Sequence, residues 1–233
     1  MKKLIGLFCL IIMAVFTVIF VNEAYAAETP LYMKRIEMAT DLVNKMALQA
    51  DAAGMADTIR SSKGVAIFPD VAKAGFIIGA EEGQGLVLLR TENGGWSGPA
   101  FMGISGASVG FQAGAESIGL VLVINNDNGL HAFTGGDSFK LGADVAVAAG
   151  PVGREFGAST NAPLKASLYS YSMTEGLFAG ISLSGLVINQ NRDLNLAYWG
   201  KKMTAQQALA DPATNSRILP LVRALDGLME KGK

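Results

Sequence analysis

Hydrophobic and polar residues change their spacing along this chain, and the changes predict where helices and strands lie. Between residues 29 and 61, hydrophobic positions recur at helical spacing, with charged residues mostly on the other side. Gly54 is expected to separate a long helix from a short second helix that ends near Arg60. The side predicted to be buried carries Ile36, Thr40, Val43, Ala47 and Ala50.

After these two helices the spacing becomes that of β-strands. Short runs rich in aliphatic residues cover residues 65–68, 75–80 and 85–90, and each is bounded by Pro or Gly. Asn93-Gly94 predicts a two-residue hairpin turn of type I′, because both central residues of that turn need a positive φ. A similar segment that ends at Asn128-Gly129 predicts a second hairpin of the same design.

Alternating patterns mark the later strands. From Gly106 to Ala115, glycine and small polar residues alternate with apolar residues. This pattern predicts a strand with one bare face, which lets a neighbouring backbone approach closely. The same alternation occupies residues 141–149 and 177–183, so further strands are expected there.

The C-terminal segment has a helical pattern again. Thr204 is expected to cap a short helix, and Asp211-Pro212 is expected to begin a second helix that runs towards Met229. Pro220 should kink or restart this second helix. Together the segments predict an α+β fold, in which a strongly curved, mostly antiparallel β-sheet, barrel- or sandwich-like, is flanked by N-terminal and C-terminal helices.

An ordered set of motifs occupies residues 63–101. It consists of a Phe68-Pro69 break, Gly83-Gln84-Gly85, the Asn93-Gly94 turn and Trp96-Ser97-Gly98-Pro99, and GASVGFQAGAE follows at residues 106–116. This order resembles the SYLF domain, a lipid-binding module of bacterial envelope proteins and of some eukaryotic membrane-trafficking and actin-patch proteins. The resemblance covers about residues 40–226. It implies phospholipid binding at a basic and apolar N-terminal helix.

The first 26 residues have the composition of an export signal. Two lysines precede an apolar run from Leu4 to Val21, and Ala24-Tyr25-Ala26 matches the small-x-small cleavage pattern. We therefore divide the chain into a signal peptide at residues 1–26 and a single SYLF-like lipid-binding domain at residues 27–233. Since the apolar run approaches the length of a membrane span, an uncleaved anchor is the alternative.

Cleavage after Ala26 changes the chemistry that the chain offers. It removes Cys9, the only cysteine, so neither a disulfide nor a thiol nucleophile is expected. The remaining chain has 17 basic and 19 acidic side chains, because Lys2, Lys3 and Glu23 are lost from totals of 19 and 20. A chain so close to neutrality has no net field that attracts nucleic acid, so we expect no nucleic-acid partner.

Candidate catalytic and metal-binding residues are few. His131 is the only histidine and is expected at the surface or at a strand edge, so no zinc or copper site is predicted. Gly83-Gln84-Gly85 lacks the third glycine of a dinucleotide-binding loop. Glu81 with Glu82 leaves a weak hypothesis of acid–base catalysis, and Asp144, on a predicted strand, would need a basic partner if it faced inwards. We expect no cofactor, no metal and no enzymatic activity.

Two segments are predicted to contact lipid. One is the N-terminal helix, which has three basic residues but also acidic neighbours that weaken its positive balance. The other has two aromatic rings followed by two lysines, the composition of an interfacial anchor. An ordinary amphipathic helix and a plain loop are the alternatives, and Trp96 is expected to be structural. The predicted lipid-binding residues are Lys34, Arg35, Lys45, Tyr198, Trp199, Lys201 and Lys202.

These observations predict a non-enzymatic phospholipid-binding module of the cell envelope that associates peripherally with the membrane surface. The alternative is a structural or scaffolding envelope protein that binds a protein partner. With the export signal, the expected location is the periplasm, the envelope or the outside of the cell.

Overall fold

The computed structural model describes residues 29–50, 52–75, 78–109, 114–151, 166–174, 177–179 and 183–231. The chain divides into a unit at Met1–Pro30 and a unit at Leu31–Lys233, and the fold below is that of the second unit. The predicted signal peptide lies outside the described residues. Within the described ranges, no helix is long and apolar enough to cross a membrane.

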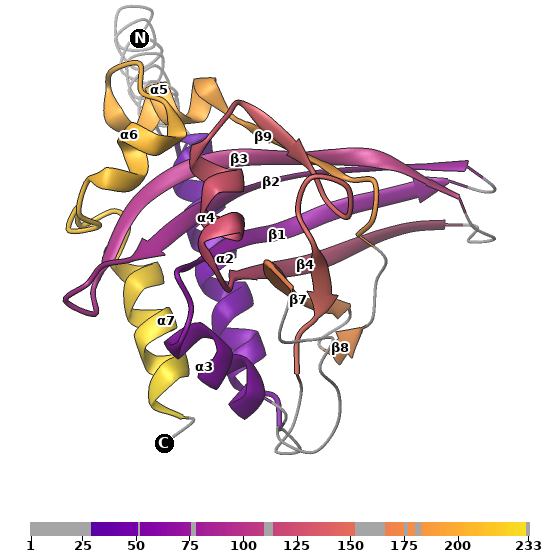
Figure 1. The fold of residues 1–233 in the computed structure, drawn as a ribbon, viewed down its shortest axis with the longest axis horizontal. Helices are drawn as coiled ribbons and strands as arrows, with labels where there is room; N and C mark the ends of the chain where they lie inside the picture. The colour runs from indigo at the N-terminus through magenta and orange to yellow at the C-terminus, as the bar shows by residue number, and fades with distance from the viewer. Residues whose placement is uncertain are drawn as a thin grey trace, which may run out of the picture. The chain divides into compact units, whose positions relative to one another are not determined.

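The second unit is built on one nine-stranded, strongly curled sheet (Figure 1). Eight strands follow the order β5-β9-β3-β2-β1-β4-β7-β6, and β8 pairs with β7. All pairings are antiparallel except that between β6 and β7. The strands are β1 (Gly64–Gly75), β2 (Ile78–Arg90), β3 (Trp96–Val109), β4 (Gly114–Ile124), β5 (Ser138–Lys140), β6 (Val147–Ala149), β7 (Leu168–Thr174), β8 (Leu177–Ala179) and β9 (Val187–Gln190).

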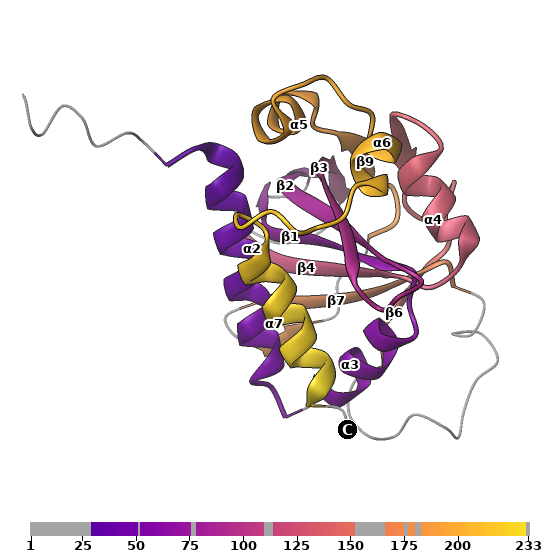
Figure 2. The ribbon, with the colours of Figure 1, turned by 90° about the vertical axis from the view of Figure 1, so that its left-hand side faces the viewer.

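Helices from both ends of the chain pack on this sheet. Figure 2 shows α2 and α7 side by side in front of the sheet, with α3 beside the lower end of α7. The fold is therefore α+β with a curved, mostly antiparallel sheet and terminal helices, as predicted. The helices are α2 (Leu31–Ala47), α3 (Ala52–Arg60), α4 (Asp127–Thr134), α5 (Arg192–Trp199), α6 (Ala205–Ala210) and α7 (Leu219–Glu230).

The sheet buries apolar side chains on both of its faces. On the face that α2, α3 and α7 cover, which we call the helix side, Ile67 and Leu86 are fully buried. On the other face, the opposite side, Phe68 and Leu120 pack in a second core with α6 and residues of α4. Alternate residues of a strand point to opposite faces, so the continuous apolar runs of the sequence match strands that are buried on both sides.

A bulge in β1 explains the glycines of β2. Between Ile67 and Val71, strand β1 has one residue more than either neighbouring strand, so Ile67 faces the helix side and Val71 the opposite side. A side chain at Gly85 would collide with the carbonyl oxygen of Ile67, and one at Gly83 would place its Cβ 2.8 Å from the carbonyl oxygen of Asp70. The predicted break between strands at residues 75–80 and 85–90 is therefore wrong, because these glycines lie inside one long strand.

The first predicted hairpin is present, but its turn differs. Thr91 donates its N–H to the carbonyl of Gly95, and Gly94 donates to the carbonyl of Thr91. Gly94 has a positive φ of +80°, and it follows the two central residues of the turn instead of being one of them. The loop is thus a three-residue connection with a left-handed glycine, and not the two-residue type I′ turn.

The second predicted hairpin is wrong, because Asn128-Gly129 lies in helix α4. The side chain of Asn126 accepts a hydrogen bond from the N–H of Gly129 at 3.1 Å and so caps this helix. His131 is exposed on α4, at the surface as expected but not at a strand edge.

The N-terminal segment is helical, as predicted, but its break lies elsewhere. The two helices separate at residues 48–51, whereas Gly54 is buried within α3. Ala50 is exposed, and the buried side of α2 is shifted by about one residue from the predicted one. Its buried residues are Ile36, Ala39, Leu42, Val43 and Met46.

The C-terminal helices confirm one predicted cap and correct the other. Thr204 forms a capping box with Gln207 at the start of α6, as the sequence indicated. The second helix does not begin at Asp211-Pro212, since Pro212 forms a β-bridge with Ser97. Helix α7 begins at Leu219, with Pro220 in its first turn, so this proline starts the helix.

The other alternating segments are only partly strands. Residues 141–145 form a turn in which Gly142 has a φ of +80°, so the strand predicted over 141–149 is reduced to β6. In the glycine-rich segment, Gly106 lies in β3 and Gly114 in β4, and Gly110 lies outside the described residues. A Cβ at Gly106 would lie 3.2 Å from the Cα of Leu186, so a neighbouring backbone comes close to this glycine, as predicted for that face.

Candidate functional site

Three aromatic rings from the N- and C-terminal parts of the chain meet the ring of Phe101 in β3. We call Tyr32, Phe101, Tyr198 and Trp199 the aromatic cluster. The ring of Tyr198 stands perpendicular to that of Tyr32, with the centroids 5.6 Å apart, and lies 5.6 Å from Phe101 and 5.1 Å from Trp199. The cluster therefore joins the start of α2 to the end of α5, two elements that carry the predicted lipid-binding residues.

Arg217 places a positive charge over two rings of the aromatic cluster. Its guanidinium carbon lies 4.5 Å from the ring centroid of Tyr198 and 5.5 Å from that of Tyr32. Arg217 also donates a hydrogen bond to the hydroxyl of Tyr32 at 3.1 Å. Burial raises the pKa of the Tyr198 hydroxyl, and the nearby charge of Arg217 opposes this shift. Arg217 has no carboxylate partner within the described part of the chain.

Asn195 attaches α5 to the sheet. Its side chain accepts a hydrogen bond from the N–H of Phe101 at 2.8 Å and donates one to the carbonyl of Phe101 at 3.1 Å. Asn195 is only 1% exposed. Strand β9 ends at Gln190, which pairs with Met102, so the Asn195 amide pairs with Phe101 in place of a further β9 residue. Sequence reasoning missed Asn195, because a single polar residue within a short helix gives no recognisable signal.

The predicted basic residues are mostly exposed and unpaired. Lys34 and Lys45 are exposed on α2, while Arg35 is half-buried and its Nε is buried without a hydrogen-bond partner. Lys201 and Lys202 are exposed just after the left-handed Gly200 that ends α5. None of these five side chains takes part in an ion pair among the described residues.

The exposed face of α2 has a balanced charge. Lys34 and Lys45 are eleven residues apart, which places them on the same side of a helix and about 16 Å apart along its axis. Glu37 and Asp41 lie between them and are also exposed, so these four side chains have no net charge, and the half-buried Arg35 leaves the helix with a net charge of +1. Leu31 and Leu48, at the two ends of the face, are 47% and 76% exposed.

The two aromatic residues of the predicted interfacial anchor are not free surface groups. Tyr198 is 3% exposed and packs in the aromatic cluster. Trp199 is half-buried, and its indole N–H donates to the carbonyl of Pro99 at 3.1 Å. In this conformation Tyr198 packs the core and cannot insert into a membrane. The role of the neighbouring lysines stays a prediction.

Lys202 also lines a surface hollow of about 470 Å³ between α5 and α6. Leu196, which is 39% exposed, and Met203 give this hollow an apolar part, and Arg192 lies at its border in an ion pair with Asp137 at 2.6 Å. An exposed leucine beside an unpaired lysine is a combination that suits the boundary between lipid headgroups and acyl chains.

Trp96 has the structural role that the sequence suggested. It is buried in the helix-side core, and its indole N–H donates to Asp226 of α7 at 2.9 Å. The guanidinium of Arg90 lies 4.9 Å from the ring centroid. Trp96 thus ties the start of β3 to the C-terminal helix.

The carboxylates do not form the acid–base pair of the enzyme hypothesis. Glu81 is buried and forms an ion pair with Lys73 at 3.3 Å, whereas Glu82 is exposed on the other face of the sheet, as adjacent strand residues must be. Asp144 is exposed in a turn and accepts a hydrogen bond from the N–H of Lys140 at 2.7 Å. Across the described residues, no group of three or more histidine, cysteine, aspartate or glutamate residues could hold a metal ion.

Comparison with known proteins places the chain in a family. The family model Ysc84, described as "Las17-binding protein actin regulator", matches residues 105–228. The SH3 domain-containing YSC84-like protein 1 of Bos taurus is 36% identical over 177 residues, which cover 76% of this chain and 52% of the relative. The human protein of the same name is 34% identical with the same coverage.

A yeast relative extends the comparison. LAS seventeen-binding protein 3 of Saccharomyces cerevisiae is 34% identical over 177 residues, which cover 73% of this chain and 38% of the relative. The chain thus spans about half or less of the length of these relatives. Since the family model covers more than half of the chain, this protein belongs to the Ysc84 family, which is the family of the SYLF domain that its motifs resemble.

Proposed function

We propose that this protein is a non-enzymatic phospholipid-binding module that associates peripherally with a membrane surface of the cell envelope. The observation that carries the proposal is the joining of α2 to α5 by the aromatic cluster. It connects two elements that each present exposed, unpaired lysines beside exposed leucines. Such a combination of basic and apolar side chains binds the headgroup region of an anionic membrane.

The expected binding is weak. Each basic side chain near an anionic surface contributes about 1 kcal/mol, so Lys34, Lys45, Lys201 and Lys202 contribute at most about 4 kcal/mol before Glu37 and Asp41 subtract from it. Burial of a fully exposed leucine adds roughly 1.5–3 kcal/mol. Binding should therefore depend on both terms and should weaken as salt screens the charges.

Vesicle co-sedimentation tests this proposal. We expect the protein to pellet with vesicles that contain phosphatidylglycerol at low salt, and much less with vesicles of phosphatidylcholine alone. Changing Lys34, Lys45, Lys201 and Lys202 together to glutamine should abolish the difference between the two lipids. Arg35 is left unchanged, because its guanidinium is partly buried and its loss would also disturb packing.

A matched control carries the same kind of change elsewhere. Lys63 and Lys140 are also exposed, so their replacement by glutamine lowers the positive charge without touching α2 or α5. Comparison of this double variant with the Lys201/Lys202 double variant separates a local site from a general charge effect. Equal losses in the two double variants would contradict a defined lipid-binding surface.

The envelope location is part of the proposal and rests on the export signal at residues 1–26. Mass spectrometry of the protein recovered from the producing cell should show a chain that begins at Ala27. A chain that keeps its first 26 residues would replace secretion by membrane anchoring.

A protein partner is the second candidate. The family description and the name of the yeast relative both refer to binding of the protein Las17, and this supports a scaffolding role for the present chain. A pull-down in the absence of lipid tests it. Recovery of the same protein by the parent and by the fourfold lysine variant would favour scaffolding over lipid binding.

A further inference from the structure

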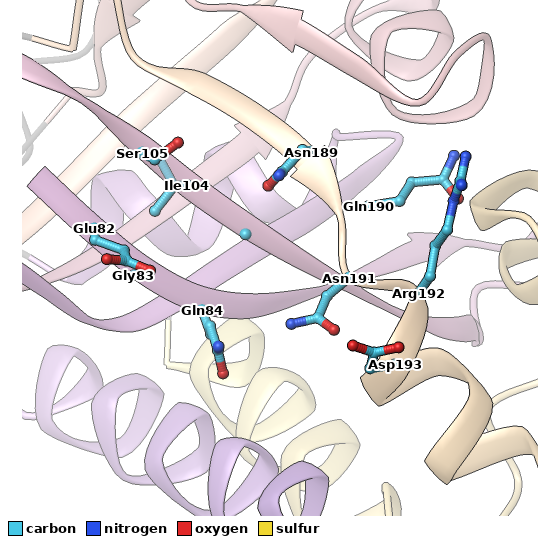
Figure 3. Close-up of a pocket in the computed structure, with 11 residues that line it drawn as sticks. Glu82, Gly83, Gln84, Ile104, Ser105, Asn189, Gln190, Asn191, Arg192 and Asp193 are labelled. Carbon is cyan, nitrogen blue, oxygen red and sulfur yellow. The ribbon is translucent and has the colours of Figure 1, made fainter.

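A polar cleft adjoins the hollow that Lys202 lines and shares Gln190, Arg192 and Asp193 with it. It has a volume of about 440 Å³ and is formed on the helix side of β2, β3 and β9 together with the first residues of α5 (Figure 3). The volume falls within the range of small-molecule sites, roughly 300–1,000 Å³. The polar side chains that line it include Glu82, Gln84, Ser105, Asn189, Asn191 and Asp193.

Strand register explains how the two amides reach the cleft. Gln84, Gly103 and Asn189 are direct partners on three neighbouring strands, so their positions face the same side. A Cβ at Gly103 would lie 2.5 Å from Oδ1 of Asn189, which means that the Asn189 amide leans over the bare backbone of β3. A side chain at position 103 would therefore compete with the Asn189 amide for this space.

Several polar groups of the cleft have no partner among the residues that the structure describes. Oε1 of Gln84 is buried and has no hydrogen-bond partner among the described residues. Buried polar atoms usually have a partner, because leaving one unpaired costs the free energy of its lost hydration. Glu82 and Asp193 form no ion pair with any described residue, and the Asn191 side chain uses its oxygen to cap α5 by accepting from the N–H of Leu194.

The chemistry of these groups selects a class of ligand. Amide and hydroxyl groups both donate and accept hydrogen bonds, as the hydroxyls of a sugar do. The two carboxylates repel anions, and the one guanidinium at the cleft, that of Arg192, is already paired with Asp137 at 2.6 Å. The apolar side chain of Ile104 is buried in the core of the opposite side, so an acyl chain finds little apolar lining here.

We infer that this cleft binds a saccharide, that is, a hydroxyl-rich ligand which is uncharged or positively charged. Gln84 lines the cleft, and rotation of its side chain brings the unpaired Oε1 within reach of a sugar hydroxyl, while neighbouring hydroxyls bond to the Asn189 amide and to the carboxylates of Glu82 and Asp193. The Asn191 amide nitrogen, free of the cap, adds a donor on the side of α5.

Side-chain amide NMR of the purified ¹⁵N-labelled protein tests the inference. Titration with glucose or glucosamine should shift the amide signals of Gln84, Asn189 and Asn191, with glucosamine binding the tighter of the two because its ammonium group meets the carboxylates. Glucose 6-phosphate should bind at least about tenfold more weakly than glucosamine, since its phosphate is repelled by the same carboxylates.

Variants show whether the shifts report the cleft. Gln84→Leu keeps the size of the side chain but removes its acceptor, and should weaken glucosamine binding by about tenfold. Gln206→Leu, at an exposed position of α6 outside the cleft, is the matched control and should bind as the parent does. Because Gln84 is half-buried, Ser105→Ala provides a second, milder change at an exposed position, expected to weaken binding several-fold.

Three outcomes would overturn the inference. One is the absence of amide shifts with both sugars, another is equal binding by the parent, Gln84→Leu and Ser105→Ala, and the third is tighter binding of glucose 6-phosphate than of glucosamine. Loss of vesicle binding in the lysine variants has no bearing on this result, because none of those lysines lines the cleft.

Discussion

Replacing Asn195 with alanine tests how α5, and with it the aromatic cluster, is held on the sheet. The change removes both hydrogen bonds to Phe101, which is fully buried. The Phe101 carbonyl keeps the N–H of Asn191 at 2.9 Å as a donor, but the Phe101 N–H is left without an acceptor. The effect should therefore be dominated by one orphaned backbone donor.

The magnitude follows from three terms. An unsatisfied buried donor costs about 1–3 kcal/mol, and the loss of a net favourable hydrogen bond costs about 0.5–1.5 kcal/mol. Alanine is a better helix former than asparagine by about 0.6 kcal/mol, which acts in the other direction. We expect Asn195→Ala to lower the free energy of unfolding by about 2 kcal/mol, or the midpoint of thermal unfolding by roughly 4–8 °C for a domain of this size.

Urea denaturation followed by circular dichroism is the assay. The midpoint should fall while the m-value stays that of the parent, because the surface exposed on unfolding does not change. Asn44→Ala is the matched control, since Asn44 is exposed on α2 and its replacement should be neutral or slightly stabilising. A loss below about 0.5 kcal/mol for Asn195→Ala would refute the argument that this side chain replaces a missing strand partner.

Three further changes test other contacts. Gly106→Val should destabilise the domain by about 1–3 kcal/mol, because its Cβ would lie 3.2 Å from the Cα of Leu186 and the added methyl groups would crowd that backbone; an unchanged melting curve would contradict the close approach. Thr204→Ala should cost about 0.5–2 kcal/mol in urea denaturation through the lost capping box, whereas Thr214→Ala, at an exposed position, should cost less. Burial raises the pKa of Tyr171, so stability should fall as the pH rises above about 10, and Tyr171→Phe should flatten this fall in pH-dependent melting.

The helices and the curved sheet could be predicted because the spacing of apolar residues reports which face of an element is buried. The Thr204 cap was also predictable, since the bonds of a capping box lie within four residues of the chain. Features that depend on distant partners were not. Asp211-Pro212 has the local signature of a helix start, yet Pro212 is held in a bridge to Ser97 at the start of β3.

Local signals also failed where two of them competed. Asn128-Gly129 favours a hairpin turn, but Asn126 provides a helix cap two residues earlier, and the cap prevails. For the candidate site, the composition of residues 198–202 suggested exposed rings. Their burial depends on Tyr32 and Phe101, which are far away in the sequence. The exposed lysines were predictable, because charged side chains seldom lose their hydration without a partner.

The extra residue in β1 has a consequence for how this sequence can vary in length. Before the bulge, odd-numbered residues of β1 face the helix side, and after it they face the opposite side. Val71 therefore joins the opposite-side core, and Lys73 reaches Glu81. Deleting one residue between Ile67 and Val71 would remove the bulge and give β1 as many residues as its neighbours, so Val71 would still pair with Gly83 and face the opposite side. This stretch should therefore tolerate the loss of one residue but not of two, because a second deletion would leave β1 one residue short of its neighbours and turn Val71 to the helix side. Changes in length should also be tolerated at the exposed loop of residues 92–95, which lies between β2 and β3.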